Sequence, residues 1–466
     1  MFEDIPVEVG LVHEGERIRK GDMQVEFGGP HCAEKFELLR VRPAGEIESG
    51  AIRIVGPDIS ELPEGGSHPL GILVEIAGSQ LEEDLEGVFE RRIHEYCNYI
   101  QGFMHLNQRY DIWIRLSKKS YKKGFTSLRL IGQVMLELFR SELPIIEIVQ
   151  ITFFTDPDRV REHYHRAMVI YEARDAKARG LADEDVDVFY GCALCQSFAP
   201  SHVCVITPQR YANCGAISWF DGRAAARIDP KGPIFPIEKG MCLDPVRGEY
   251  TGINESAAKR SMGAVNRISL YSGFGYPHTS CGCFEASAFF IPEVEGYGIV
   301  HRNYHDRAVS GLPFSTMAEA TAGGRQVDGF HGISIEYMRS KKFLQGDGGY
   351  SAVVWMPAEV KERLTEYIPP EIGHAIATET DAQTIDTLKE FLAAHEHPVV
   401  KRWGTTGGTR EEIARPAPFV PAGDISFMTG GVRILLKNAR IYAEKIIIQP
   451  VQPASPRKPG RGGEHG

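Results

Sequence analysis

Residues 189–219 read FYGCALCQSFAPSHVCVITPQRYANCGAISW, and a second stretch, residues 279–286, reads TSCGCFEA. The first stretch carries four of the nine cysteines in the spacing C-x2-C-x8-C-x9-C: Cys192, Cys195, Cys204 and Cys214. The second stretch carries Cys281 and Cys283 on either side of Gly282. Because grouped, reduced cysteines bind metals, we expect these two stretches to organise the second half of the chain around a metal centre.

The four-cysteine group fits two kinds of metal site. A [4Fe–4S] cluster takes four thiolates, and so does a structural zinc ion. Zinc ribbons usually pair two C-x2-C knuckles, whereas only Cys192 and Cys195 form a knuckle here, and Cys204 and Cys214 stand alone on what we expect to be long loops. The spacing therefore favours an iron–sulfur cluster, with zinc as the alternative.

The tripeptide C-G-C suggests a different ion. Two thiolates and the backbone nitrogens of Gly282 and Cys283 can supply a planar set of two nitrogens and two sulfurs, which favours Ni(II). Glycine in the middle lets the backbone bend around the ion. The alternative is that Cys281 and Cys283 are small buried residues in a turn. Beside a four-cysteine group in the same chain, we favour nickel.

Composition excludes several classes of function. The chain has 466 residues, 42% of them apolar and 24% charged, and a net charge of −10, which gives no attraction to nucleic acid. No run of 18 apolar residues is present, so we expect no membrane span. The first residues, MFEDIPVEVG, lack the basic start and apolar core of a secretory signal. We therefore expect a cytoplasmic, anaerobic protein whose thiols stay reduced.

Hydrophobic periodicity predicts two domains of α/β (α+β) class, with mixed β-sheets flanked by helices. In the first domain, residues 1–155, we expect strands at 51–55, 70–77 and 145–154 and helices at 81–100 and 128–140. The second domain, residues 156–450, holds the metal cluster in its loops; a charged helix at 156–179 opens it. Further helices are expected at 254–269, 358–368 and 382–395, and strands at 298–302, 351–356, 432–436 and 441–448. The Gly-rich stretch 321–332 is expected to be a loop, and residues 451–466 a disordered basic tail.

At the cysteine motifs the sequence resembles acetyl-CoA synthase, known in archaea as the β subunit of the acetyl-CoA decarbonylase/synthase complex. The resemblance also covers SKKFLQGDGGYSAVVWMP at 340–357 and TDPDRV at 155–160. It extends over nearly the whole chain up to about residue 400. It points to the archaeal, short form, because longer bacterial members carry an additional N-terminal domain that docks onto carbon monoxide dehydrogenase.

The resemblance implies a Ni–Ni–[4Fe–4S] site, the A-cluster of that family. Cys192, Cys195, Cys204 and Cys214 would hold the [4Fe–4S] cube, and Cys195 would also bridge to a proximal nickel. Cys281 and Cys283 would bridge the proximal nickel to a distal nickel, which the backbone nitrogens of Gly282 and Cys283 complete. Phe198 aligns with an aromatic residue that covers the labile nickel, although ordinary core packing would equally explain a phenylalanine.

The resemblance also implies the reaction and the partners. The expected enzyme is a CO-methylating acetyl-CoA synthase, which reversibly joins CO, CoA and a methyl group carried by a corrinoid iron–sulfur protein, in a complex with carbon monoxide dehydrogenase subunits. The first domain would face CoA and the corrinoid protein. The alternative is an electron-transfer or scaffold subunit that holds an iron–sulfur cluster without nickel.

For the phosphates of CoA we expect a basic patch around RLSKKSYKKGFTSLRL, with Lys122 and Lys123 at its centre. A run of charge is also what an ordinary solvated surface shows.

Overall fold

The structure is a computed structural model. It describes residues 2–29, 31–194, 204–275, 284–321, 327–403, 424–429 and 432–437. The chain divides into a compact unit at residues 1–409 and a short unit at 410–466. None of the helices in the described ranges is both long enough and apolar enough to cross a lipid bilayer.

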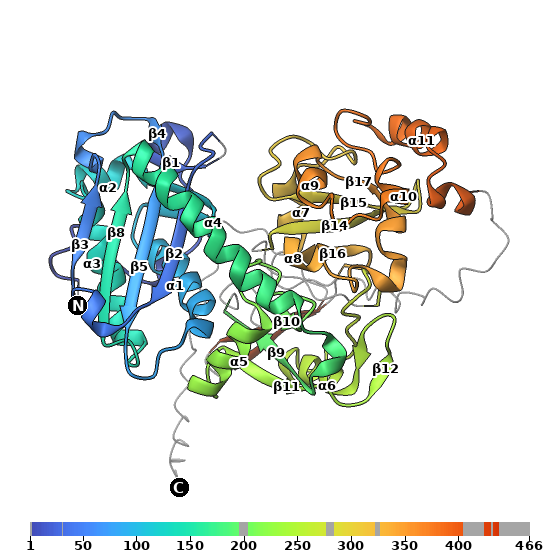
Figure 1. Cartoon of the computed structure of the whole chain (residues 1–466), viewed down its shortest axis with the longest axis horizontal. Helices are drawn as coiled ribbons and strands as arrows, with labels where there is room; N and C mark the ends of the chain where they lie inside the picture. Colours follow the sequence, from blue (N-terminus) through green and yellow to red (C-terminus); the bar gives the residue numbers. More distant parts are fainter. Residues whose placement is uncertain are drawn as a thin grey trace, which may run out of the picture. The chain divides into compact units, whose positions relative to one another are not determined.

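A mixed four-stranded sheet forms the first layer of the larger unit (Figure 1). Its order is β2-β5-β8-β3, with β2 parallel to β5, β5 antiparallel to β8 and β8 parallel to β3. The strands are β2 (Phe36–Val41), β3 (Ile52–Val55), β5 (Gly71–Ala77) and β8 (Ile148–Phe154). Helices α1 (Glu86–Asn98) and α3 (Leu128–Glu142) pack on one face, and the long α4 (Pro157–Arg179) lies across the other.

A second four-stranded sheet, with the order β4-β1-β7-β6, packs beside these helices. It consists of β1 (Met23–Gly28), β4 (Gly66–His68), β6 (Phe103–Gln108) and β7 (Asp111–Ser117), and the short α2 (Lys118–Lys122) follows β7. The turn between β6 and β7 contains Arg109, which has a positive φ of 59°. This turn carries Arg109 and Tyr110 toward the C-terminal half of the unit, where both take part in the contacts described below.

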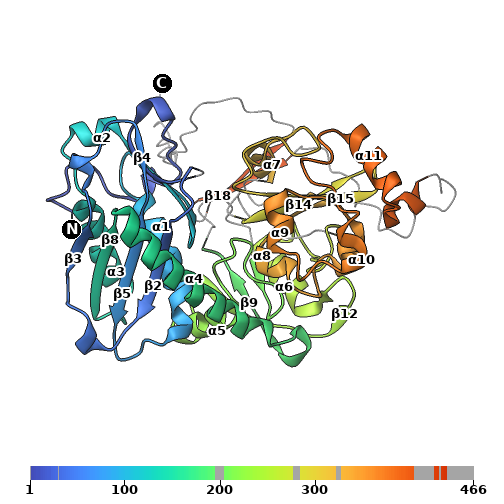
Figure 2. The same cartoon turned by 45° about the horizontal axis from the view of Figure 1, so that its top comes forward.

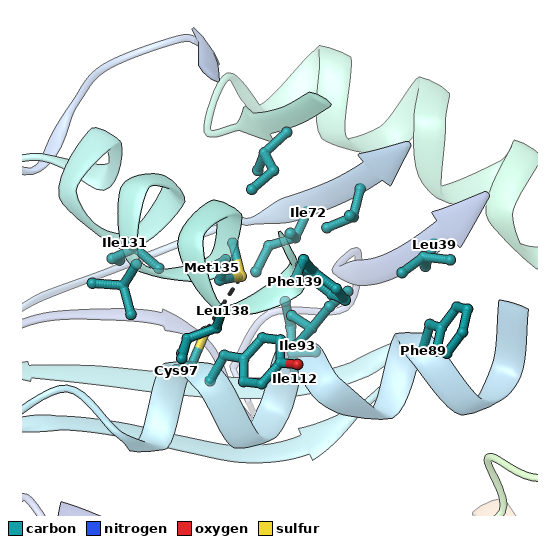
Figure 3. Close-up of a cluster of buried hydrophobic side chains, with 14 of the residues drawn as sticks. Leu39, Ile72, Phe89, Ile93, Cys97, Ile112, Ile131, Met135, Leu138 and Phe139 are labelled. Atoms are coloured by element: carbon teal, nitrogen blue, oxygen red, sulfur yellow. Dashed lines mark hydrogen bonds between the residues drawn. The ribbon is translucent and has the colours of Figure 1, made fainter. Parts of the chain in front are cut away.

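The core of this region lies where α1 and α3 meet the two sheets (Figure 3). Apolar side chains from both helices interlock with strand residues from both sheets, for example Ile72 of β5 and Ile112 of β7. Cys97 of α1 is fully buried there, with its Sγ 3.9 Å from Sδ of Met135. A buried thiol in an apolar core acts as a small hydrophobic residue, so Cys97 has a packing role.

The cysteine-bearing region begins directly after α4. Three antiparallel strands form a small sheet with the order β10-β9-β11, made of β9 (Val188–Cys192), β10 (Cys204–Ile206) and β11 (Ile234–Glu238). Helix α5 (Trp219–Ile228) packs on this sheet, and Ser218 caps it with a capping box that includes Asp221. The hairpin β12 (Cys242–Asp244) and β13 (Glu249–Tyr250) follows, and then α6 (Thr251–Arg260).

A third four-stranded sheet completes the larger unit. Its order is β16-β14-β15-β17, formed by β14 (Ala286–Ile291), β15 (Gly296–His301), β16 (Phe330–Ile333) and β17 (Val353–Trp355). The helices of this part are α7 (Phe314–Thr321), α8 (Ile335–Met338), α9 (Ala358–Arg363), α10 (Pro370–Gly373) and α11 (Ile385–Ala394), as Figure 2 shows from a second side. In the smaller unit, the hairpin β18 (Asp424–Thr429) and β19 (Val432–Lys437) is described.

The predicted fold class is confirmed, since three mixed four-stranded sheets and the helices that flank them lie in the described part of residues 2–403. The predicted strands correspond to β3, β5, β8, β15, β17 and β19, and the predicted helices to α1, α3, α4, α9 and α11. The strand expected at 441–448 and the tail at 451–466 lie outside the described residues. The division into domains at residue 155 stays a prediction.

Two local predictions are wrong. The helix expected at 254–269 ends at Arg260, because Met262 and Gly263 have positive φ values of 54° and 83° and turn the chain away. The stretch expected to be a loop, residues 321–332, ends in a strand, because its last three residues belong to β16 (Phe330–Ile333). Gly332 is a glycine there for packing, since a Cβ would lie 2.7 Å from the ring of Phe284. Gly332, one of the glycines that suggested a loop, is therefore explained by the close packing of the Phe284 ring against the backbone of β16.

Candidate metal centre

Cys192 and Cys204 face each other on paired strands. Cys192 is the last residue of β9, Cys204 is the first residue of β10, and the two are direct partners in the antiparallel register. Directly opposed residues project their side chains from the same face of a sheet, so both thiols point to the same side. The expectation that Cys204 lies on a long loop is therefore wrong, because the strand pairing itself sets the spacing of these two thiols.

Cys214 reaches the same place from the segment between β10 and α5. Its neighbour Asn213 donates its backbone N–H to Sγ of Cys204 over 3.3 Å. The side chain of Asn213 accepts a hydrogen bond from Nη2 of Arg210 at 3.1 Å. Asn213 therefore links the Cys204 sulfur to the segment that carries Cys214.

The electrostatics of the three thiols show that they are close neighbours. Burial raises the pKa of Cys192 well above its usual value, and the Cys204 and Cys214 sulfurs raise it further. Burial also raises the pKa of Cys204 to about 11, against the lowering effect of Arg210. Without a metal these two buried thiols are protonated at neutral pH, so metal binding releases protons.

Positive charge surrounds these thiols. Arg210 is fully buried and adjoins Cys204, while Arg91 and Arg260 interact electrostatically with Cys192. Apart from the Cys204 sulfur, the hydrogen-bond acceptors of Arg210 within the described residues are uncharged: the carbonyls of Val205 and Leu270, the amide of Asn213 and the ring of His331. A buried cation needs a compensating anion. A group of metal-bound thiolates supplies one, so the surroundings fit an anionic metal–thiolate centre.

The segment after the C-G-C tripeptide lies against the Cys214 segment. Glu285 donates its backbone N–H to the carbonyl of Asn213 over 2.8 Å. Phe284 is fully buried against the rings of Phe314 and Phe330. The two cysteine motifs, 67 residues apart between Cys214 and Cys281, therefore meet through their flanking residues.

A cavity of about 610 Å³ opens beside this contact. Gly215 and Glu285 line it together with Tyr110 from the β6–β7 turn and Arg363 from α9. The cavity therefore leads from the N-terminal α/β layers and the third sheet to residues that flank both cysteine motifs.

Comparison with known proteins gives concordant matches along the chain. The family described as CO dehydrogenase/acetyl-CoA synthase complex beta subunit matches residues 5–160, and the family described as the C-terminal part of the ACS/CODH beta subunit matches residues 171–403. The acetyl-CoA decarbonylase/synthase complex subunit beta of Methanothermobacter thermautotrophicus is 52% identical over 462 residues, which covers 96% of this chain and 100% of that protein. The same subunit of Methanopyrus kandleri is 52% identical over 456 residues, or 96% and 97% of the two chains.

The chain belongs to the acetyl-CoA decarbonylase/synthase beta-subunit family. The resemblance stated from the cysteine motifs is therefore confirmed. Among solved structures, the C-terminal domain of an acetyl-Coenzyme A synthase alpha subunit is 36% identical, covers 26% of this chain and 95% of that chain, and has a TM-score of 0.24.

The structure brings together three of the expected cluster ligands, Cys192, Cys204 and Cys214. Cys195, Phe198 and the tripeptide Cys281–Gly282–Cys283 lie outside the described residues, so their assignments stay predictions. Among the residues that are described, no three His, Cys, Asp or Glu side chains converge as ligands of a single ion. A four-iron cube is bound at separate corners, and the three thiols with their positive surroundings fit such a group better than one small ion.

The predicted CoA residues lie elsewhere in the chain. Lys122 ends α2 and Lys123 caps it, and both side chains are exposed. In both views α2 lies far from β9 (Figures 1 and 2). Lys123 donates to Oε1 of Gln101 at 2.6 Å, and Lys118 pairs with Glu64 at 2.8 Å. Part of the basic patch is thus engaged within the protein, and its CoA role stays a prediction.

Three residues of this centre are not predicted from the sequence: Arg210, Asn213 and Glu285. Arg210 and Asn213 lie within the motif that the cysteines marked, and Glu285 lies two residues after Cys283. Polar residues so close to metal-binding cysteines are a usable signal, because ligands are commonly oriented by hydrogen-bonding neighbours. Nothing in the sequence pattern indicated that Arg210 would be fully buried.

Proposed function

We propose that the chain carries a Ni–Ni–[4Fe–4S] centre at which acetyl-CoA is assembled from, or cleaved into, CO, a methyl group and CoA. Membership of the beta-subunit family makes it an enzyme of acetyl-CoA synthesis and decarbonylation. The composition of the centre rests on the two cysteine motifs and on the positive surroundings of the buried thiols.

The observation that carries the proposal is the in-register pair Cys192 and Cys204 beside the buried Arg210. The strand pairing presets the two thiols, and among the described residues Arg210 has no carboxylate partner in hydrogen-bonding contact. Both features fit a permanent anionic cluster. When bound, the nickel ions supply a site where methyl and CO ligands can meet and be passed to the CoA thiolate.

The protein's own contribution is geometry and exclusion of water. Cys192 and Cys204 are only 6% and 7% exposed, and Val205 beside them is fully buried. A dry, apolar shell limits solvent access to the cluster and tunes its potential. The N–H of Asn213 and the guanidinium of Arg210 lower the energy of negative charge on the Cys204 sulfur.

The nearest alternative is an iron–sulfur subunit without nickel chemistry, which the family does not favour. We further propose a methyl-corrinoid iron–sulfur protein and carbon monoxide dehydrogenase subunits as partners, in the cytoplasm. The relatives are themselves named as subunits of a complex, which supports partner subunits in general.

Replacing Cys281 or Cys283 by serine tests the proposal. Each variant should lose acetyl-CoA formation and nickel while it keeps the iron–sulfur absorption, because the cube depends on the other four cysteines. Elemental analysis of anaerobically purified wild-type protein should find about two nickels per four irons, whereas an electron carrier has none. Full activity in either serine variant would contradict the assignment.

A further inference from the structure

The two cysteine motifs meet at the side chain of Glu285, which is not one of the predicted metal ligands. Residue 285 follows the C-G-C tripeptide by two positions, and its backbone N–H is bonded to the carbonyl of Asn213, just before Cys214. On the other side of Cys214, Gly215 has a φ of 79°. A Cβ there would lie 2.3 Å from Oε2 of Glu285. Glu285 therefore contacts the chain on both sides of Cys214.

The carboxylate of Glu285 is held by two donors from different parts of the fold. Oε1 accepts from the hydroxyl of Tyr110 at 3.1 Å, and Oε2 accepts from the backbone N–H of Ile335 at 2.8 Å. Tyr110 in turn accepts a hydrogen bond from Arg363 of α9. The orientation of this side chain is thus set by the β6–β7 turn, α8 and α9 together.

The backbone at Glu285 is anchored as well. Arg302 donates its backbone N–H to the carbonyl of Glu285 at 3.0 Å, and its side chain donates to the carbonyl of Phe284. Ala286 then enters β14, paired with His301 and Ile333. The chain that leaves the tripeptide is therefore fixed within two residues, and Glu285 is the point where it touches the Cys214 segment.

We propose that Glu285 is a positioning residue that sets the C-G-C tripeptide at the correct distance from the [4Fe–4S] ligands, with its carboxylate wedged against Gly215. This inference rests on the proposed function. Thiolates that bind more than one metal tolerate little misplacement. Metal sites therefore depend on neighbouring residues that hold the ligands in position.

The test replaces Glu285 and measures nickel binding directly. Protein with its iron–sulfur cluster intact, freed of nickel by a chelator, is titrated anaerobically with Ni(II). The Glu285→Ala variant should bind nickel about tenfold or more weakly, while its iron content and iron–sulfur absorption equal those of the wild type. The CO-dependent paramagnetic signal should fall with it.

Two further variants keep the test decisive if Glu285→Ala fails to retain iron. Glu285→Gln has the same shape but one acceptor oxygen for two donors, Tyr110 and Ile335, so it should weaken nickel binding less than Glu285→Ala does. Gly215→Ala presses on the same carboxylate from the opposite side and should reproduce the nickel loss. The control is Glu359→Ala, which removes an exposed carboxylate lining the same cavity and should change nothing.

Equal nickel affinity in the wild type, Glu285→Gln and Gly215→Ala would overturn the positioning role and leave the proposed function standing. A wild-type protein that takes up no nickel at all would overturn the proposed function, and this inference with it.

Discussion

Two buried arginines in this molecule differ in the partners that surround their charge. Arg109, in the β6–β7 turn, is 5% exposed and pairs with Asp175 at 3.2 Å and with Glu90 at 3.8 Å. Burial alone would lower the pKa of Arg109, but Asp175 and Glu90 raise it well above its usual value. Arg210, beside Cys204, is fully buried, and burial lowers its pKa because its hydrogen-bonding partners in the described chain are neutral.

The difference separates a region whose buried charges are balanced by its own side chains from one whose buried charge a metal–thiolate group would balance. Arg109 and Arg174, in the α1–α4 layers, are neutralised without any added group, since each has carboxylate partners. Beside the cysteines, burial lowers the pKa of Arg210, and Tyr337, Cys204, Tyr271 and the carboxylate of Asp183 offset this only in part. The negative charge that Arg210 lacks becomes available when the cysteines bind metal as thiolates.

The largest expected effect comes from removing Arg210. In the metal-loaded protein, Arg210→Met should lower the free energy of unfolding by about 3–5 kcal/mol, because the anionic cluster loses its buried counter-charge. In metal-free protein the loss should be smaller by about 2 kcal/mol, since the thiols are then protonated and the arginine is itself uncompensated. Anaerobic urea unfolding of both forms measures the difference.

Arg109→Met is the matched control for that experiment. It leaves the carboxylate of Asp175 without its cation whether or not metal is present, while Glu90 keeps Arg174, so its effect should be the same in both forms. If Arg210→Met also has the same effect in both forms, the contrast between the two arginines is wrong.

An intermediate effect on the free energy of unfolding is expected from a change of pH. Burial raises the pKa of Asp175 to about 6, against the lowering effect of Arg109, and Glu336 and Tyr211 also face it. Because the folded state then holds this proton more tightly than the unfolded state, stability falls as pH rises from about 4 to about 6. Asp175→Asn should remove this slope, a difference on the order of 2 kcal/mol across that window.

Unfolding curves at pH 4, 5, 6 and 7 for the wild type and Asp175→Asn give the test. Only the difference between the two proteins matters, because other acids titrate in both. Parallel stability profiles would show that Asp175 is held ionised by Arg109 in the folded protein.

The smallest effect on stability is expected from the exposed cations of α2. Reversing Lys122 and Lys123 to glutamate should change the free energy of unfolding by less than about 0.5 kcal/mol, because neither side chain is buried. If this patch binds CoA phosphates, the apparent CoA affinity should fall about tenfold, and less at high salt. Lys341→Glu, an exposed lysine outside the patch, is the control. An unchanged CoA affinity would exclude the patch.

The sequence predicts the elements that periodicity marks clearly. Helix α3 has a continuous apolar face from Leu128 to Phe139, and β5 is an apolar run, so both were predicted close to their observed bounds. Helix α6 was overextended because a left-handed Met262 leaves no trace in the hydrophobic pattern. Strand β16 was missed because Gly332, required by the ring of Phe284, looked like a loop residue.

In the candidate site, too, some features can be predicted from the local sequence and others cannot. The cysteines could be identified from spacing alone, since their side-chain chemistry determines what they bind. The pairing of Cys192 with Cys204 could not, because β9 and β10 are short and the register of two short strands leaves no mark in the local sequence pattern. Arg210 and Glu285 act through contacts with segments distant in sequence, which no local pattern records.

The cross-strand register of Cys192 and Cys204 has a practical consequence for handling the protein. Opposed residues in an antiparallel pair have Cα atoms about 4.5 or 5.5 Å apart, within the span that a cystine bridge accepts. Oxygen that reaches the protein after metal loss can therefore oxidise Cys192 and Cys204 to a disulfide between β9 and β10, with little change to the fold. Preparations inactivated in this way would look well folded, and should regain metal only after treatment with a thiol reductant.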